Sequence, residues 1–453
     1  MKKSWLNFWR KLTSGSVNRQ IFSAVFTVGL FTGFVKLTTI AKEVIVAWRF
    51  GTNEQLDAFL IALIVPGFAI NVVAESLNAA LIPTYIRVRE QEGTKAAHRL
   101  FASATVCSTA LLLFATIIIA VTAPLYLKII ASGLTPEILT LTRNLLWSLT
   151  PIICLSGIRT IWGAILNAGE RFAMAAFTPI IIPVISILLL LCFSSWGVYA
   201  LTAGLVVGAL LEIVLLAWVL NKQRIPLRPR WSGFDSNLRI VIDQYIPTAA
   251  GALLVCSAMP VDQIMAAMLS PGSVAALNYS NRIIVSPISL MTIALGTAVI
   301  PYFSKMIAAN DWKSLQRTLE KYLSWVFIFT IPLSIGLIVF AEPIVRLMFE
   351  RGSFNASDTL IVATIQKFYA LQIPFYLANI LLVKLINSLN KNHILFWLSA
   401  CNLILNVSLN YLLVKLMGIQ GIALSTSLVY IFSFSFAFIF VRRQLNQKNI
   451  TKI

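Results

Sequence analysis

Long apolar runs separated by short polar segments dominate the sequence. A transmembrane helix needs about 20 predominantly apolar residues, and each run has at least that length. Twelve runs can be drawn, at 21–48, 57–83, 100–128, 138–168, 172–195, 197–220, 244–269, 273–303, 322–343, 359–390, 393–416 and 419–441. The pattern therefore predicts an all-α polytopic membrane protein with about 12 transmembrane helices.

Composition supports this interpretation and excludes a soluble enzyme with one membrane anchor. Of 453 residues, 58% are hydrophobic and only 12% are charged, whereas a soluble protein has about 25% charged residues. The net charge of +19 is best explained by cytoplasmic loops rich in Lys and Arg, because the basic residues gather in alternate loops. We expect no nucleic-acid partner.

The distribution of basic residues predicts the orientation. If the N-terminus is cytoplasmic, the cytoplasmic segments contain 24 Lys and Arg residues, and the outside segments contain four, Arg49, Lys128, Arg346 and Arg351. This asymmetry over short loops predicts that both termini lie in the cytoplasm.

An internal repeat predicts two similar halves. Residues 79–85 (AALIPTY) recur 218 positions later as 297–303 (TAVIPYF), so Pro83 matches Pro301. Six predicted helices separate the two copies, so both halves enter the membrane in the same sense. Such parallel repeats form the two lobes of secondary transporters, with a central cavity between them. The predicted divisions are a cytoplasmic N-terminal segment 1–20, a six-helix lobe 21–221, a cytoplasmic linker 222–243, a second six-helix lobe 244–441 and a cytoplasmic tail 442–453.

The residue types needed for common enzyme chemistry are missing. The only histidines, His98 and His393, are far apart, and the five cysteines lie in apolar runs without metal-ligand spacing. No phosphate-binding glycine loop is evident, and the outside loops are too short to hold a catalytic domain. We therefore expect neither enzymatic activity nor a resident cofactor.

Four stretches together resemble a known family, the MurJ/MviN lipid II flippases of the multidrug/oligosaccharidyl-lipid/polysaccharide (MOP) exporter superfamily. They are AKEVIVAWRFG (41–51) with Asp57, Ala58, Phe59 and Pro66; GAILNAGERF (163–172) with Phe177 and Pro179; Gly272 to Val274 and YSNR (279–282) with Pro287; and LGTAVIP (295–301). The resemblance covers most of the chain. It implies a MOP/MATE-like fold of two lobes around a central cavity.

The resemblance also implies substrate-binding positions. In that family, cationic side chains in the first lobe and on the eighth helix are thought to meet the pyrophosphate and sugar head of a polyprenyl-linked precursor. The matching positions are Lys36 and Lys42 on the first helix, Asp57 at the start of the second, and Arg282 on the eighth.

The chain also departs from the family pattern. Lys36 and Lys42 stand where lipid II flippases favour Arg, Ile70 occupies a further Arg position, and Val285 replaces an acidic residue one turn after Arg282. The two additional carboxy-terminal helices common in the family are missing from this sequence. The identity of the glycan stays open between a peptidoglycan precursor, O-antigen, enterobacterial common antigen and an exopolysaccharide unit.

Basic residues within the predicted spans indicate either a wet cavity or internal ion pairs. A Lys or Arg at mid-span costs about 2.5–3.5 kcal/mol on insertion scales, so such residues usually face water or a partner. The candidates for one cationic vestibule that binds the anionic head are Lys36, Lys42, Arg159, Arg282, Lys367 and Lys384. The alternative is pairing of Lys36 or Lys42 with Glu43 or Glu75, and of Arg159 with Glu212.

A second set of polar residues predicts a cation site in the second lobe. Asp262 on the seventh helix, Asn402 and Asn406 on the eleventh, and Thr426 on the twelfth supply hard oxygen donors with one negative charge, which suit Na⁺. The resemblance implies a sodium site on these helices, with Asn402 and Asn406 as the pair from helix eleven. The alternatives are hydrogen bonding between helices and proton transport by Asp262.

Together with these observations, the resemblance implies a monomeric flippase of the bacterial cytoplasmic (inner) membrane. It would move a polyprenyl-pyrophosphate-linked glycan, lipid II or a related oligosaccharide or polysaccharide precursor, from the inner to the outer leaflet by alternating access. Its partners would be this glycan lipid and membrane lipids. The alternatives are a MATE-type cation-coupled multidrug exporter, whose pocket should be acidic or aromatic, and a membrane glycosyltransferase or ligase, which would need large outer loops.

Overall fold

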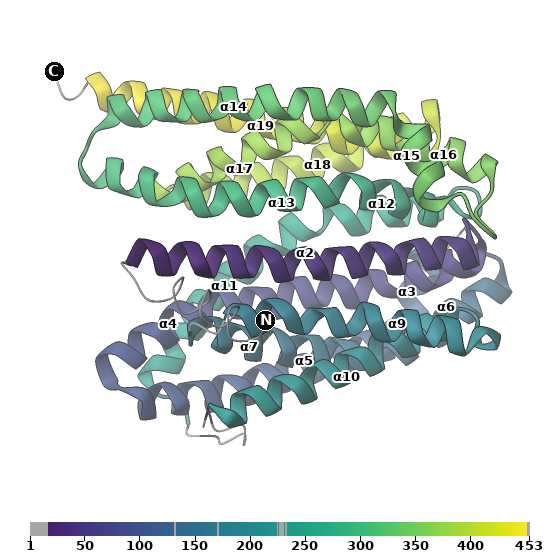
Figure 1. Cartoon of the computed structure of the whole chain (residues 1–453), viewed down its shortest axis with the longest axis horizontal. Coiled ribbons are helices and arrows are strands. Elements are labelled where there is room, and N and C mark those ends of the chain that lie inside the picture. The colour runs from purple at the N-terminus through teal and green to yellow at the C-terminus, as the bar shows by residue number, and fades with distance from the viewer. Residues whose placement is uncertain are drawn as a thin grey trace, which may run out of the picture. The chain divides into compact units, whose positions relative to one another are not determined.

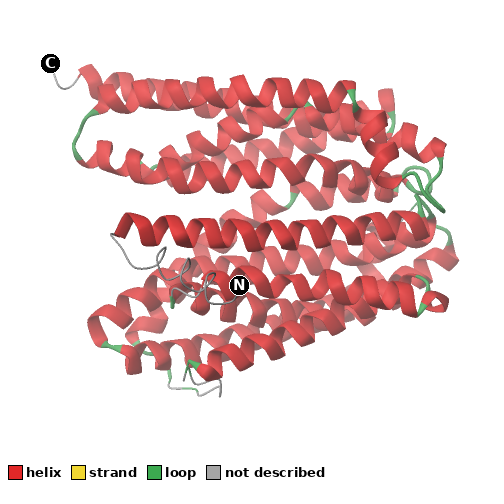
Figure 2. Cartoon of the chain, viewed as in Figure 1, coloured by secondary structure: helices red, strands yellow, loops and turns green. Residues whose placement is uncertain are grey.

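The computed structural model describes residues 17–130, 133–169, 172–223, 225, 231 and 233–450. Helices joined by short loops form the described part of the chain, and no described residue lies in a strand (Figure 2). The predicted N-terminal segment up to residue 16, part of the predicted linker and the last three residues lie outside the described residues.

Each of the first six predicted runs falls on one helix or on consecutive helices, which Figure 1 labels in part. They are α2 Val17–Phe50, α3 Glu54–Ala69 with the π-helix η1 Ile70–Glu75 and α4 Ser76–Glu92, α5 Thr94–Ile130, α6 Pro136–Leu149 with α7 Pro151–Ala168, α8 Phe172–Phe177 with η2 Thr178–Ile180, α9 Ile181–Cys192 and η3 Ser194–Trp196, and α10 Val198–Lys222.

The last six predicted runs agree with the helices in the same way. They are α11 Ser236–Cys256 with α12 Ala258–Ala267, α13 Ser273–Ala308, α14 Trp312–Val339, α16 Ala356–Ala370 with α17 Ile373–Ser388, α18 Asn392–Met417 and α19 Ile419–Ile450. One further short helix, α15 Ala341–Phe349, follows α14.

Length and hydropathy make this a polytopic membrane protein. Nine continuous helical stretches in the described residues are long and apolar enough to cross a membrane, and the number is ten if the bent pair α16 and α17 is counted as one span. Helices α2 and α13 are 34 and 36 residues long and cover the predicted runs 21–48 and 273–303.

Proline accounts for two of the breaks within predicted runs. Pro151 occupies the first turn of α7, where its missing N–H costs nothing, and it ends α6 just before it. Pro374 likewise lies in the first turn of α17. The axes of α16 and α17 differ by 40° at this break. Pro66 and Pro83 instead lie inside α3 and α4, on either side of the π-helix η1.

The described helices belong to two compact units. The described residues of unit 1 fall within 1–45, 65–125 and 142–252, and those of unit 2 fall within 46–64, 126–141 and 253–453. The lobe boundaries expected from the sequence, 21–221 and 244–441, stay a prediction.

Close helix packing organises unit 1. Helix α10 packs against α7 and α9, and α4 packs against α7. A Cβ atom on Gly204 would lie 2.6 Å from Ser186 Cα, and one on Gly208 would lie 2.8 Å from Ile182 Cα. Small residues four apart therefore let α10 and α9 approach closely, as is common in membrane helices. Leu81, Phe101, Leu166 and other apolar side chains fill the core beside them.

The main helix packing of unit 2 involves α13, α14 and α16–α19. Helix α19 packs against α16, α17 and α18, while α13 packs against α16 and α17. The side chains of Leu377, Leu381, Leu382 and Leu385 line the buried face of α17. This dense packing holds the polar side chains described below at fixed positions.

A glycine junction closes one end of unit 2. Gly51 and Gly352 have φ angles of +56° and +58°, and a Cβ atom on either would lie within 2.4 Å of a backbone oxygen, that of Ser353 or of Trp48. Ser353 N–H donates to Trp48 O at 2.9 Å, and Tyr279 Oη donates to Gly51 O at 3.2 Å. Only glycine permits these loops to lie so close together.

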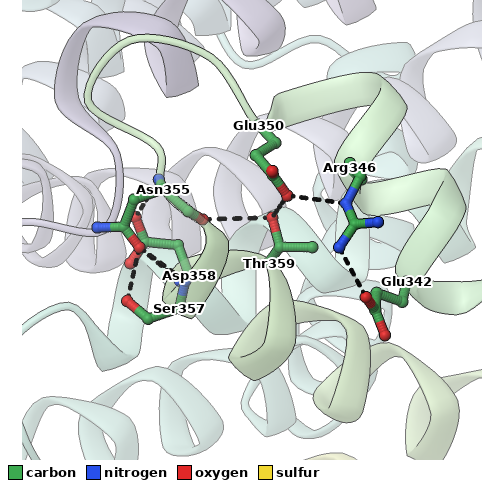
Figure 3. A network of polar contacts seen from close by, with 7 residues as sticks. All are labelled: Glu342, Arg346, Glu350, Asn355, Ser357, Asp358 and Thr359. Atoms are coloured by element: carbon green, nitrogen blue, oxygen red, sulfur yellow. Dashed lines mark hydrogen bonds and ion pairs between the residues drawn. The ribbon is translucent and has the colours of Figure 1, made fainter.

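A polar network supports the same loops (Figure 3). On α15, Arg346 pairs with Glu342 at 2.8 Å and with Glu350 at 3.2 Å. Glu350 also accepts a hydrogen bond from Thr359 at 2.7 Å, which lowers the pKa of the Glu350 carboxyl. Asn355 caps α16 by accepting from the backbone N–H of Asp358.

Candidate substrate and cation sites

Two of the predicted substrate-binding cations lie on α2 in unit 1. Lys42 is half-buried, and its Nζ lies 3.0 Å from Glu43 Oε1, so the pairing weighed from the sequence is present. Lys36 is also half-buried, and no described residue forms an ion pair or hydrogen bond with it. Glu75, the other carboxylate considered as a partner, is exposed on η1.

An apolar groove runs along α2 beside Lys36. It has a volume of about 410 Å³ and is lined by Gly29, Leu30, Gly33, Phe34 and Leu37. Both glycines leave open space where a side chain would stand. This surface suits a hydrocarbon chain rather than a charged head group.

Arg159 is held by a buried carboxylate in unit 1. Its Nη1 lies 3.4 Å from Glu212 Oε2, which joins α7 to α10. The Glu212 side chain is 1% exposed, and that of Arg159 is 29% exposed. The internal pair expected as an alternative is therefore formed. It uses a single contact, so the guanidinium retains N–H donors for another acceptor.

The remaining predicted cations belong to unit 2. Arg282 is exposed on α13, Lys367 is exposed on α16, and Lys384 is half-buried on α17. Their contribution to a common vestibule stays a prediction.

Asp57 is buried and caps a helix. It is 2% exposed, and its two carboxylate oxygens accept hydrogen bonds from the backbone N–H groups of Gly272 and Ala275, each at 2.7 Å. A carboxylate at this position complements the partial positive charge at the start of α13. These contacts stabilise the start of α13. A role of Asp57 in substrate binding stays a prediction.

Asp262 is the centre of a buried polar cluster in unit 2. Its Oδ1 accepts from Asn406 Nδ2 at 3.1 Å and from Asn410 Nδ2 at 2.6 Å, and its Oδ2 accepts from Thr426 Oγ1 at 3.1 Å. The carboxylate belongs to α12, the amides to α18 and the hydroxyl to α19. Three of the four predicted cation ligands, Asp262, Asn406 and Thr426, are therefore together.

Asn402 is separate from this cluster, and Asn410 takes the place expected for it. Asn402 Nδ2 donates to Ser433 Oγ at 3.2 Å instead. Asn402, Asn406 and Asn410 follow each other at four-residue intervals on α18, which is the spacing of one helix face. This pattern was visible in the sequence and could have indicated Asn410.

The Asp262 cluster fits a small hard cation. One carboxylate, two amides and a hydroxyl converge, and Asn410 Oδ1 is buried without a hydrogen-bond partner among the described residues. Turning the two amides would direct their oxygens, rather than their N–H groups, towards the carboxylate. The described residues contain no group of three or more His, Cys, Asp or Glu side chains that could hold a metal ion.

Comparison with known families places these features in context. The family model for "Lipid II flippase MurJ" matches residues 46–453. The probable lipid II flippase MurJ of Synechocystis sp. is 25% identical over 430 residues, which cover 91% of this chain and 80% of that protein. The lipid II flippase MurJ of Burkholderia cenocepacia is 27% identical over 381 residues, which cover 81% of this chain and 72% of that protein.

Solved structures share the fold. An inward closed conformation of the lipid II flippase MurJ gives a TM-score of 0.80 at 23% identity and covers 93% of this chain and 90% of its own. An inward-facing multidrug resistance MATE transporter of the MOP superfamily gives a TM-score of 0.80 at 14% identity. The match covers 94% of this chain and 100% of that transporter. The predicted all-helical MOP/MATE-like fold is confirmed. Because the family model spans most of the chain, this polytopic membrane protein belongs to the MurJ family of lipid II flippases.

Proposed function

We propose that the protein moves lipid II, a polyprenyl-pyrophosphate-linked glycan, from the inner to the outer leaflet of the bacterial cytoplasmic membrane by alternating access. The family match over residues 46–453 carries this proposal. The mid-helix cations support it, because an anionic head group needs positive partners to cross the hydrocarbon region. No covalent bond is made or broken.

The pyrophosphate would meet Lys36 and Lys42 on α2 and Arg282 on α13. Glu43, 3.0 Å from Lys42, would neutralise this lysine between transport events, and a phosphate oxygen would then compete for it. Arg282 can bind a phosphate with two parallel N–H donors, whereas each lysine acts as a mobile point charge. Lysines in place of arginines should hold the head group less rigidly.

The other cations would act later along the path or in positioning the head group. Arg159 retains donors beyond its single contact with Glu212, and Lys367 and Lys384 lie on adjoining helices of unit 2. The apolar groove of α2 offers a surface for the polyprenyl chain beside Lys36. The protein would work as a monomer among membrane lipids, with both termini in the cytoplasm.

Asp262, Asn406, Asn410 and Thr426 would bind the coupling cation. Sodium matches a set of hard oxygen donors with one net charge, and Asp262 could alternatively carry a proton. The bound cation would neutralise the buried carboxylate, which is costly to leave uncompensated within a membrane. Cation binding could therefore bias which conformation the empty carrier adopts.

Complementation tests the proposal directly. In bacteria depleted of their own MurJ, we expect the wild-type chain to restore growth and outer-leaflet lipid II, and Lys42→Ala and Arg282→Ala each to abolish both. Lys415→Ala is the matched control, because Lys415 is exposed and donates to Tyr411 on the same helix. Membrane abundance of each variant separates transport from folding.

Full growth and lipid II export by both cavity variants would contradict the cationic path. Failure of the wild-type chain to replace MurJ, together with rescue of a strain depleted of another glycan-lipid flippase, would assign a different glycan. Export of an organic cation such as ethidium without lipid II export would favour the MATE-type alternative.

A further inference from the structure

A second buried polar cluster lies between three helices of unit 2. Ser433 on α19 is 2% exposed, and its Oγ accepts hydrogen bonds from Asn379 Nδ2 on α17 at 3.1 Å and from Asn402 Nδ2 on α18 at 3.2 Å. The Oδ1 atoms of both asparagines are buried and have no hydrogen-bond partner among the described residues. We call these three residues the Asn–Ser triad.

Turning the amides does not satisfy the triad. Ser433 has one hydroxyl hydrogen, so it can donate to one amide oxygen only. Every turned amide then leaves its own N–H₂ group without an acceptor. At least two polar groups stay unpaired in each arrangement, and unpaired buried polar groups are costly. The triad therefore has capacity to bind a small guest that interacts with several oxygens.

The triad follows directly after the Asp262 cluster along the helices. Asn402 is four residues from Asn406 on α18, a helical rise of about 6 Å, and Asn406 donates to Asp262. On α19, Tyr430 lies between Thr426 and Ser433 in sequence, and its ring packs against that of Tyr376 with centroids 4.9 Å apart. The two clusters therefore follow each other along α18 and α19, and we call the pair the polar file.

The file extends towards the beginning of α18. Helix α18 begins at Asn392. Of the three asparagines at positions 402, 406 and 410, Asn402 is nearest to that end. By the distribution of basic residues, this is the helix end predicted to face the cytoplasm. The triad would therefore lie on the cytoplasmic side of Asp262.

We infer that Asn379, Asn402 and Ser433 form a second, weaker position for a monovalent cation, through which the ion bound by Asp262 exchanges with the cytoplasm. The inference rests on the proposed cation site at Asp262. Amide and hydroxyl oxygens are hard ligands suited to Na⁺, and the lack of a carboxylate makes binding weak. An ion path needs such positions, because an ion held tightly at every step would not leave.

Sodium exchange in proteoliposomes tests the inference with the full-length protein. We would measure equilibrium binding of ²²Na⁺ and the rate at which bound ²²Na⁺ exchanges, for wild type, Asp262→Asn, Ser433→Ala and Asn402→Asp. Ser435→Ala is the matched control, because Ser435 is an exposed serine of the same helix that donates to Ile431 O.

The expected results differ between variants. Ser433→Ala should keep equilibrium affinity within about twofold but slow exchange about tenfold, because a transit position is lost while the tight site remains. Asn402→Asp should raise equilibrium affinity about tenfold and slow release, because it adds a carboxylate to the weak position. Asp262→Asn should lose equilibrium binding, and Ser435→Ala should behave as wild type.

Two outcomes would overturn the inference, and they differ from each other. Wild-type binding and exchange in both Ser433→Ala and Asn402→Asp, with binding lost in Asp262→Asn, would leave the Asp262 site intact and make the triad a structural contact. Wild-type sodium binding by Asp262→Asn would contradict the proposed Asp262 site and the relay with it.

Discussion

At the scale of single residues, the sequence predicted the kinds of ligand in unit 2 but not which asparagines meet Asp262. Asn402, Asn406 and Asn410 offer two equivalent pairs at four-residue spacing, so spacing alone cannot choose between them. The position of α12 against α18 decides, and it places Asp262 beside Asn406 and Asn410. The partners of Asp57 also depend on helix packing, because only the fold shows that its carboxylate caps α13.

This difference predicts that two alanine variants affect sodium binding unequally. Asn410→Ala removes a donor 2.6 Å from Asp262, and we expect it to weaken sodium-dependent stabilisation about tenfold in apparent affinity, or about 1.4 kcal/mol. Asn402→Ala should keep that affinity within about twofold, since its contact is to Ser433. Thermal unfolding in NaCl and in choline chloride measures both. A larger loss from Asn402→Ala would restore the pair predicted from the sequence.

At the scale of elements, helix positions followed from the sequence because length and hydropathy are local properties. Breaks within the runs did not, since proline acts in two ways here. Pro151 begins α7, whereas Pro247 and Pro332 lie inside α11 and α14. Neighbouring helices can satisfy the carbonyl groups that a proline frees in a membrane, so its effect depends on packing that the sequence does not display.

The glycine junction gives a prediction at this scale. Gly51→Ala forces a side chain into a φ of +56° and places Cβ 2.3 Å from Ser353 O. It should therefore destabilise the protein by more than the backbone strain of a positive φ. Gly197→Ala is the control, because Gly197 has a φ of +55° with nothing within 4 Å of the added Cβ. The strained backbone alone costs about 1–3 kcal/mol for a residue other than glycine. Thermal unfolding in detergent should show the larger loss for Gly51→Ala, and equal losses would mean that the loops separate readily.

At the scale of the whole molecule, the order of the chain and the compact units differ. The repeat predicts a division near the linker 222–243, but residues 46–64 and 126–141 belong to the same compact unit as the second half. Asp57 shows why, because its hydrogen bonds to Gly272 and Ala275 span more than 200 positions of sequence. A sequence repeat shows which segments are similar to each other. The compact units instead follow from the contacts that the folded chain makes.

The charge moved in a full transport cycle provides the last prediction. A pyrophosphate head carries roughly two negative charges, and its outward movement across an inside-negative potential gains about 2.3 kcal/mol per charge for each 100 mV. Lipid II export in proteoliposomes should therefore accelerate when a potassium diffusion potential makes the cytoplasmic side negative, and should slow when the potential is reversed. Asp262→Asn separates the two sources of this dependence. If lipid II carries the charge, residual export by that variant should keep its voltage dependence. If the inward-moving cation carries the charge, the voltage dependence should be lost.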